Sequence, residues 1–462
     1  MIYLMRRTFH IRKKEEFCVK ILVAGAGHGG LTAAALLAAD GYDVTVLEKC
    51  TPDTAGLDQT DAFDAQAFEY AGIPVPQDFT RGANRLTFIP LENGVEPLTL
   101  PRSKEESIIV NRKKLLRYLT DFAVCSGVKI EYGVEVTGAI MLGSRVAGVK
   151  TQQGDMYADL IIDACGVHSP VRCSLPQFTS VDRPIHTYDL LHTYRAAFKK
   201  NEEAEQPDTY YNIYLREDGT VGLSWVITGS SDVDILVARF PQITDADVLK
   251  TLVELHGENP QMDTQIISTN KYRDIPVCQP LAVLVADGYA AVGDSAFMTY
   301  PVKGSGIAYS VKAGKMLADT VKADINGFFT AETLWGYQKR FFEEIGDNAC
   351  RLALIKNLLP YMTAAEVNEI FKDKLVTGEE LERIMTDRLE AVLNAAAIPI
   401  IREKIKLVRS NAALKEKLLD LAVWLGKFTL IAPTMPSHYD REDAARWAQR
   451  YNEFFDSVRK SE

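Results

Sequence analysis

A glycine-rich hexapeptide near the start of the chain, Gly25-Ala26-Gly27-His28-Gly29-Gly30, has the composition of a phosphate-binding turn. Residues 19–24 before it are apolar and predict a buried strand, and the small residues at 31–39 after it predict a helix. The first glycine permits a tight turn, the second lets the backbone approach a pyrophosphate, and the last lets helix and strand pack closely. Unpaired N–H groups at the helix N-terminus then face the phosphates. The pattern predicts a dinucleotide site, in which the backbone N–H of His28 matters more than its ring.

An acidic residue stands where such a site needs one. Glu48 ends a second predicted strand, residues 43–47, and lies 18 residues after Gly30. Its carboxylate is placed to accept hydrogen bonds from both ribose hydroxyls, and it would repel a 2′-phosphate. The expected ligand is therefore FAD or NAD and not NADP, and the neighbouring Lys49 is assigned to the same site.

A second glycine-rich segment follows an apolar run at residues 289–292. That predicted strand delivers Gly293 and Asp294 to its carboxyl end, where ligands bind in open α/β sheets, and the aspartate can bond a ribityl hydroxyl. Gly304 and Gly306 precede a predicted helix at 307–321, whose N-terminus can face a flavin carbonyl and the negative charge of reduced flavin. Pro301, Ser305 and Ile307 are assigned to the same flavin-binding turn.

The order of these segments resembles that of the flavoprotein superfamily containing the p-hydroxybenzoate-hydroxylase-type monooxygenases and the geranylgeranyl reductases. Four landmarks carry the resemblance, and together they extend from about residue 19 to residue 320. They are the glycine-rich turn with Glu48; Arg112-Lys113-Lys114-Leu115; Asp163-Ala164-Cys165-Gly166 with Ser169 and Arg172; and Gly293-Asp294 with Pro301, Gly304 and Gly306.

The resemblance implies an α/β protein with a Rossmann-like, glutathione-reductase-like FAD-binding domain and an inserted antiparallel substrate sheet. It implies that Gly56 and Leu57 pass the flavin ring, and that Tyr300 and Lys303 flank the proline facing that ring. These two residues are the best-placed proton donors, although a surface role for Lys303 is equally compatible. The remaining residues assigned to the cofactor are Arg112, Val136, Cys165 and Gly166.

The third landmark departs from the hydroxylase pattern, which usually reads G-A-D-G. Asp163 replaces the first glycine and Cys165 replaces the aspartate. This weakens the hydroxylase interpretation, and the small-residue pattern at 313–318 resembles the reductase branch. Cys165 is interpreted as a small buried residue beside the cofactor, since a redox role would need a partner thiol and only Cys173 is near in sequence.

These observations favour an FAD-dependent oxidoreductase that reduces an activated C=C bond of an apolar, prenyl-like small molecule, with NAD(P)H as a possible electron donor. One alternative is a flavin-dependent monooxygenase using NAD(P)H and O2. A non-enzymatic alternative is a binding protein on the scaffold of the Rab GDP-dissociation inhibitors, against which the intact flavin-binding turn speaks.

The composition of the chain limits its possible partners and its cellular environment. The chain has 462 residues, of which 47% are hydrophobic and 25% charged, and its net charge of −10 argues against nucleic-acid binding. Seven cysteines without a C-x-x-C pair predict no metal site and fit a reducing cytoplasm. No apolar run reaches the length of a membrane span, but peripheral membrane contact is compatible with the sequence. The oligomeric state is open.

The predicted organisation has five parts. Residues 1–17 are a charged extension; 18–184 form the FAD-binding domain, with 80–105 contributing to the substrate layer; 185–285 form the antiparallel substrate domain; 286–334 return to the FAD-binding domain; and 335–462 are helical. On the substrate sheet, His192, Tyr194, Tyr211 and Trp225 are either core residues or ligands. Residues 414–433 predict a helix that packs on the FAD domain, covers an apolar tunnel or contacts a membrane surface.

Overall fold

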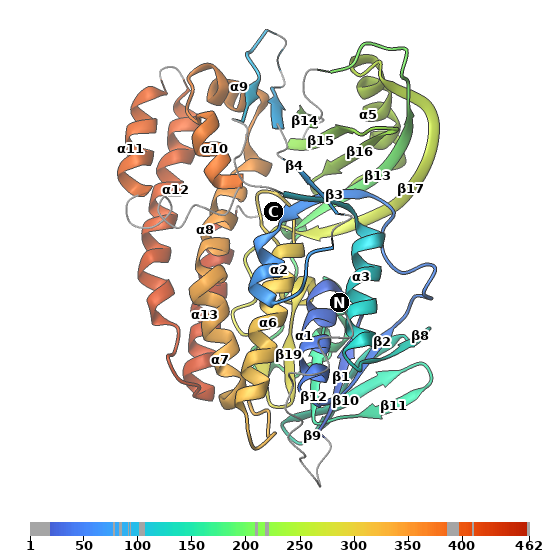
Figure 1. Ribbon diagram of the computed structural model, residues 1–462. Coiled ribbons are helices and arrows are strands. Elements are labelled where there is room, and N and C mark those ends of the chain that lie inside the picture. The colour runs from blue at the N-terminus through green and yellow to red at the C-terminus, as the bar shows by residue number, and fades with distance from the viewer. Residues whose placement is uncertain are drawn as a thin grey trace.

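The computed structural model describes residues 19–459, except 77–78, 83–85, 91, 93, 101–106, 208–210, 218–220, 386–396 and 409–410. Figure 1 shows a sheet-and-helix layer that carries the N-terminal part of the chain, a second large sheet above it, and a column of C-terminal helices along one side. The predicted extension at 1–17 falls outside the described residues. The sequence also predicts hairpin turns at residues 92–94 and 217–219, and Asn93, Asp218 and Gly219 of these turns fall outside the described residues as well.

The first layer is a Rossmann-like sheet, as predicted. All neighbouring strands in it are parallel except for the edge pair β18 and β19. Its central strands are almost wholly apolar because both faces are covered. Helices α1 (His28–Ala39), α3 (Arg112–Cys125) and α6 (Ile307–Ala323) lie against one face (Figure 1). The strand order is β18 (Val285–Ala286), β19 (Tyr289–Ala291), β12 (Leu160–Asp163), β1 (Lys20–Ala24), β2 (Asp43–Glu48) and β8 (Lys129–Tyr132).

The second layer is a seven-stranded sheet in which every pair is antiparallel except β14 and β5. Helix α5 (Asp245–Glu258) covers one face, where Leu255 packs on Phe198, Val226 and Ile235. The other face is turned towards the Rossmann-like layer and the C-terminal helices (Figure 1). The order is β17 (Met262–Pro276), β13 (Leu190–Lys200), β16 (Asp232–Arg239), β15 (Val221–Thr228), β14 (Tyr211–Glu217), β5 (Leu86–Ile89) and β6 (Leu98–Thr99).

Two small antiparallel sheets complete the strands. The sequence at residues 62–71 predicts a single helix, and the first of these sheets corrects that prediction: β3 (Thr60–Asp64) comes first and α2 (Gln66–Ala71) follows. Pairing of β3 with β7, over Thr60–Asp64 and Ser107–Asn111, overrides the local helical pattern. This sheet has the order β3, β7 (Ser107–Asn111), β4 (Thr80–Gly82), and the other has β11 (Gly154–Tyr157), β10 (Arg145–Thr151), β9 (Val136–Leu142).

The C-terminal region is helical, as predicted. Trp447, Tyr451 and Phe455 of α13 are buried and join the core of the FAD-binding layer, together with Phe428 of α12. The sequence predicts a helix break at Pro399, but this proline is the third residue of α11, where a proline is tolerated. No helix among the described residues is long and apolar enough to cross a membrane. The helices are α7 (Ala331–Phe341), α8 (Asp347–Lys356), α9 (Ala364–Lys372), α10 (Gly378–Met385), α11 (Ala397–Leu407), α12 (Ala412–Ile431) and α13 (Arg441–Val458).

Candidate cofactor site

The glycine-rich turn joins β1 to α1 through a backbone that only glycine adopts easily. Gly25 has φ +91°, and a Cβ added to it would lie 2.4 Å from the carbonyl oxygen of Ala164. A Cβ on Gly30 would lie 2.7 Å from the Cβ of Ala164, so the helix and β12 touch here. No side chain caps the N-terminus of α1. Its N–H groups are therefore available to a phosphate.

Glu48 is held in a fixed orientation at the end of β2. Its Oε2 accepts a hydrogen bond from the N–H of Ala26, and its Oε1 accepts one from the N–H of Cys50, both at 2.9 Å. A carboxylate has about four lone-pair sites, so two remain for ribose hydroxyls. The exposed Lys49 is next to it. Val136 is buried and begins β9, shortly after Val134, whose N–H donates to the carbonyl oxygen of Glu48 at 3.0 Å.

His28 has a buried nitrogen that supports a ligand at this turn. Its Nε2 has no hydrogen-bond partner among the described residues, although such nitrogens are normally paired. Burial, aided by the positive charge of Arg112, lowers the pKa of His28 to about 3, so the ring is neutral at pH 7. An N–H at Nε2 would suit a phosphate oxygen. The residues present therefore fit the pyrophosphate of FAD.

The third landmark is an internal support of the site. Asp163 is fully buried, and its carboxylate accepts hydrogen bonds from the N–H of Cys165 at 3.0 Å, Ser169 Oγ at 2.5 Å and Tyr289 Oη at 2.9 Å. These partners explain why an aspartate is accommodated in place of a glycine. Cys165 donates from Sγ to the carbonyl oxygen of Ala24 at 3.3 Å. Burial and the charge of Asp163 raise the pKa of Cys165, so its thiol stays protonated beside the turn.

Asp294 lies at the centre of the predicted flavin half. It accepts a hydrogen bond from Thr299 Oγ1 at 3.2 Å, and a Cβ on Gly306 would lie 3.1 Å from its Oδ1. Burial raises the pKa of Asp294, and the charge of Arg112 opposes that rise. Arg112 thus acts on both His28 and Asp294, and the structure brings the first, second and fourth landmarks together.

The turn from Pro301 to Gly306 faces the substrate sheet. Gly304 has φ +68°, and a Cβ there would lie 3.5 Å from Cγ2 of Ile275 in β17. Gly306 is the N-cap of α6, which has no side-chain cap, and Ile307 is its first residue. Tyr300 is 2% exposed, its N–H donates to the carbonyl oxygen of Ser305 at 2.9 Å, and Lys303 Nζ lies 5.3 Å from its ring centroid. The two predicted proton donors are therefore neighbours.

The segment with Gly56 and Leu57 is connected to the Arg112 landmark. Asn111 caps α3 and donates from Nδ2 to Asp58 at 2.7 Å, and the N–H of Arg112 donates to the carbonyl oxygen of Gln59 at 2.8 Å. A Cβ on Gly56 would lie 3.2 Å from Cα of Lys113. The start of α3 therefore holds this segment beside the turn. Gly166 follows Cys165, three residues after the end of β12, and a Cβ added to it would have nothing within 4 Å.

Charged residues that sequence reasoning missed lie where the substrate sheet meets this segment. Arg195 Nε donates to Asp234 Oδ1 at 2.7 Å, and its guanidinium also donates to the carbonyl oxygen of Thr60. Asp61 lies 4.0 Å from Arg195 and 3.6 Å from Arg112. An arginine and an aspartate facing each other on otherwise apolar strands are the signal that could have found them, since buried charges are paired.

The four polar or aromatic residues predicted on the substrate sheet are divided between its faces. Tyr194 packs on the α5 side. Trp225 and Tyr211 are in edge-to-face contact on the other side, 5.9 Å apart, and Arg195 lies 5.1 Å from the Trp225 ring. His192 Nδ1 and His168 Nε2 are each 2.7 Å from a carboxylate oxygen of Asp274, at the junction of the two layers. Burial raises the pKa of Tyr211, so it holds its proton at neutral pH.

The chain matches the family described as FAD binding domain over residues 18–341, and it belongs to that family of FAD-dependent oxidoreductases. Among curated proteins, it is 24% identical over 389 residues to digeranylgeranylglycerophospholipid reductase 2 of Methanopyrus kandleri, covering 79% of this chain and 94% of that one. It is 22% identical over 387 residues to the digeranylgeranylglycerophospholipid reductase of Sulfolobus acidocaldarius, covering 79% and 83%.

Solved structures show the same fold. A geranylgeranyl bacteriochlorophyll reductase-like protein from Thermoplasma acidophilum superposes with a TM-score of 0.69 at 19% identity, covering 84% of this chain and 100% of that one. The myxobacterial chondrochloren halogenase CndH superposes with a TM-score of 0.58 at 16% identity, covering 88% and 97%. The predicted fold class is confirmed. The predicted FAD-binding family is also confirmed.

Proposed function

We propose that this protein is an FAD-dependent reductase that saturates an activated C=C bond of a prenyl lipid. The observation that carries the proposal is a row of apolar side chains, here called the apolar surface, on the face of the seven-stranded sheet opposite α5 and beside the buried ion pair of Arg195 and Asp234. It begins at Ile275 beside Gly304, continues through Leu236, Trp225 and Ile213, and reaches Leu215. Leu215 also packs in the cluster that contains Leu414 and Leu418 of α12. Such a surface suits a long apolar chain.

The names of the curated relatives support the same substrate class, because they are reductases of a lipid with geranylgeranyl chains. Bound FAD, once reduced, supplies the hydride for such a reduction. The protein's part is to hold the double bond beside the Pro301–Gly306 turn, to exclude water with the apolar surface, and to deliver a proton. A reduced nicotinamide is the proposed electron donor.

Tyr300 and Lys303 are the proposed source of that proton. Both belong to the turn that touches Ile275, so they border the apolar surface at its flavin end. The ammonium of Lys303 lies 5.3 Å from the centroid of the Tyr300 ring, so the cation and the phenol are held together at this turn. Tyr300→Phe should slow turnover by about 10²-fold or more, within the usual range for a general acid, while leaving FAD affinity unchanged. Lys303→Met should have a smaller effect.

Stopped-flow reoxidation of the reduced protein tests the function. Under anaerobic conditions, a prenyl lipid with its double bonds should reoxidise the flavin, and the saturated lipid should not. Trp225→Leu should slow this step, whereas Tyr194→Leu, on the opposite face of the same sheet, should not. Reoxidation that requires O2 and yields a hydroxylated product would instead identify a monooxygenase.

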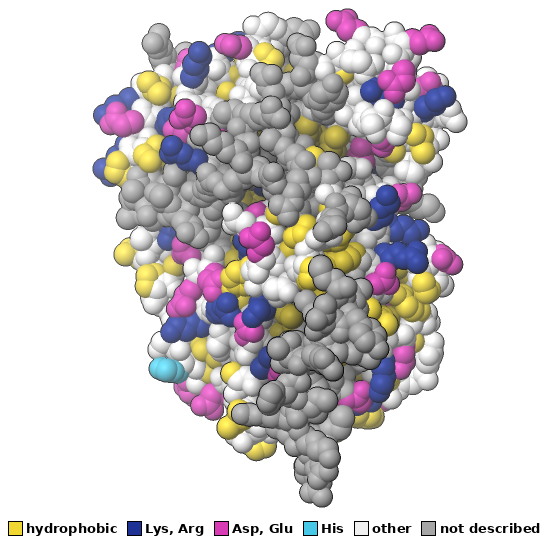
Figure 2. Space-filling model, in the orientation of Figure 1, with side chains coloured by type: hydrophobic (Ala, Val, Ile, Leu, Met, Phe, Trp, Pro, Cys, Tyr) yellow, Lys and Arg dark blue, Asp and Glu magenta, His cyan; other side chains and the backbone are white. Residues whose placement is uncertain are grey.

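Peripheral contact with a lipid surface is part of this proposal, since the substrate would be a membrane lipid, and we place the protein in the cytoplasm. The outer side of α12 exposes Leu419, Val423 and Leu430, with 51%, 52% and 72% of their surfaces accessible. Figure 2 shows hydrophobic and charged side chains interspersed along the edge of the molecule where these helices lie. Val423→Asp should reduce co-sedimentation with phospholipid vesicles, and Glu416→Gln should not.

A further inference from the structure

We infer that Arg459, just beyond the C-terminal end of α13, is a positioning residue for the flavin half of the cofactor site. It acts through a buried network of charged side chains that connects α13 to the turn carrying Gly293 and Asp294. The inference rests on the proposed location of the flavin at that turn. It gives the C-terminal helices a part in forming the site.

The first step of the network is at the turn itself. The short helix Gly293–Ala296 ends at Phe297, which is fully buried. The guanidinium carbons of Arg172 and Arg183 lie 4.7 Å and 4.6 Å from the centroid of its ring. Arg172 Nη1 also donates to the carbonyl oxygen of Ser295 at 2.7 Å. Two arginines therefore hold the segment that directly follows Asp294.

The second step leads from Arg183 to a buried carboxylate. Arg183 Nη1 donates to Asp189 Oδ2 at 2.7 Å, and Nη2 donates to Cys278 Sγ at 3.0 Å. The side chains of Arg183 and Asp189 are 5% and 2% exposed. In such surroundings the removal of one partner of an ion pair is costly, because it leaves an unpaired charge buried.

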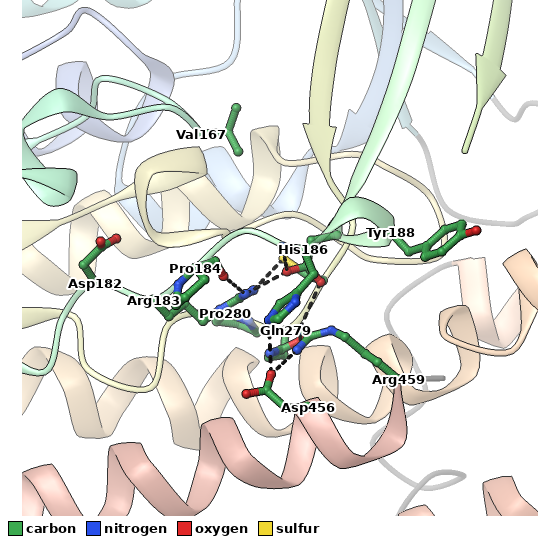
Figure 3. Close-up of polar contacts among 12 residues, drawn as sticks. Val167, Asp182, Arg183, Pro184, His186, Tyr188, Gln279, Pro280, Asp456 and Arg459 are labelled. Carbon is green, nitrogen blue, oxygen red and sulfur yellow. Dashed lines mark hydrogen bonds and ion pairs between the residues drawn. The ribbon is translucent and has the colours of Figure 1, made fainter. Parts of the chain in front are cut away.

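The third step brings in the C-terminal helix. Arg459 Nη2 donates to the other oxygen of Asp189 at 3.0 Å and to Gln279 Oε1 at 3.3 Å. Asp456, one turn earlier on α13, pairs with Arg459 and lies 3.2 Å from His186 Nε2. Figure 3 shows Arg459 and Asp456 meeting Gln279 and His186 close to Arg183. Asp189 is thus the shared partner of one arginine from each side.

Removing the Arg459 charge should therefore change the position of the turn that carries Gly293 and Asp294. Asp189 would then have Arg183 as its close guanidinium partner and would attract it more strongly. The Arg183 guanidinium would therefore shift relative to the Phe297 ring. Helix α13 should stay in place, because Trp447, Tyr451 and Phe455 anchor it in the core. The expected result is a displaced Asp294 in a protein that is still folded.

The test compares Arg459→Gln and Arg459→Lys with the control Arg446→Gln. Arg446 is on α13, its side chain is 66% exposed, and it pairs with Glu442 at 3.6 Å. Apoprotein is titrated with FAD, and the visible circular dichroism of the bound flavin and the apoprotein Tm are recorded. Arg459→Gln should weaken FAD binding about tenfold and change the flavin dichroism. Arg459→Lys should recover most of both, and Arg446→Gln should match the wild type.

Wild-type FAD affinity and dichroism in Arg459→Gln would overturn the inference, whatever happens to the Tm. If Arg459→Gln does not fold, Asp456→Asn replaces it in the test. This variant removes the ion pair of Arg459 with Asp456 but leaves the buried Arg459 charge in place, so FAD binding should weaken about twofold. Unchanged FAD binding in Asp456→Asn would overturn the inference. Gly304→Val distinguishes a failure of this inference from a failure of the proposed flavin location. If its flavin is also unperturbed, the proposed location of the flavin is at fault.

Discussion

The two halves of the candidate cofactor site are built in different ways. The half predicted for adenosine comes from one strand–helix–strand unit, in which the N–H of Gly25 donates to the carbonyl oxygen of Leu47 and the N–H of Ala26 donates to the carboxylate of Glu48. The half predicted for flavin is assembled from segments around Gly56, Arg112 and Asp294 and supported from as far away as Arg459. The first therefore depends on local backbone conformation, and the second depends on packing between distant segments.

The largest effect is expected where the backbone leaves no room. In Gly25→Ala the new Cβ would meet the Ala164 carbonyl at 2.4 Å, so FAD binding should weaken by about 100-fold or more. Gly41→Ala is the matched control, because Gly41 has φ +95° but nothing within 4 Å of the added Cβ. It should lose stability, by about 1–2 kcal/mol, and keep its FAD affinity. Calorimetric titration of the two apoproteins gives the comparison.

The second-largest loss of FAD affinity is expected from a change at Glu48. In Glu48→Ala two hydrogen bonds from ribose hydroxyls are lost, each worth about 1.5–3 kcal/mol before water compensates, so binding should weaken at least about tenfold. Glu131→Gln, on the neighbouring strand β8 and exposed, is the control. Equal FAD affinity in Glu48→Ala and the wild type would show that the carboxylate serves only the Ala26 and Cys50 N–H groups.

The stability of the apoprotein should depend on pH because of His28. Its pKa in the folded protein is about 3, below the value of about 6.5 expected for the unfolded chain. The unfolded state therefore binds the proton first, and the apoprotein should lose stability as the pH falls from 6.5 towards 3, by at most about 1.4 kcal/mol per pH unit from this group. His28→Gln should flatten that part of the profile. Urea denaturation at several pH values measures it, and identical slopes would refute the assignment.

The smallest effect is expected in the flavin half. Gly304→Val should retain FAD, because the adenosine half is intact, but it should disturb the turn that aims the N-terminus of α6 at the flavin. A helix-terminal contribution of about 0.3–2 kcal/mol corresponds to a midpoint potential lower by about 6–43 mV. Spectroelectrochemical titration decides this, and an unchanged potential would place the flavin elsewhere.

The contrast between the halves also explains what the sequence could predict. The adenosine half was accessible because Gly25, Gly30 and Glu48 stand at fixed spacings within one unit. The strand β3 was mistaken for part of a helix because its pairing partner β7 begins more than forty residues later. The partners of Asp189 could not be predicted, since Arg459 is 270 residues away and no local pattern connects them.

The apolar surface could be predicted from the sequence only in part. Trp225 and Tyr211 stood out on predicted strands, but only the pairing of β14 with β15 puts them on one face with Leu236 and Ile213. The buried pair of Arg195 and Asp234 was missed because the strand that carries Asp234 lies between its partners β13 and β15 in the sheet and not in the chain. Periodicity predicts faces of a strand, whereas strand order decides which faces meet.

The most direct test of the central claim is mass analysis of the product formed by the reduced protein and a digeranylgeranylglycerophospholipid without oxygen. The account predicts a lipid that has gained two hydrogens for each double bond reduced, one of them derived from solvent, and less product from Trp225→Leu at comparable times. An unchanged lipid without oxygen, together with an oxygenated one in air, would contradict it.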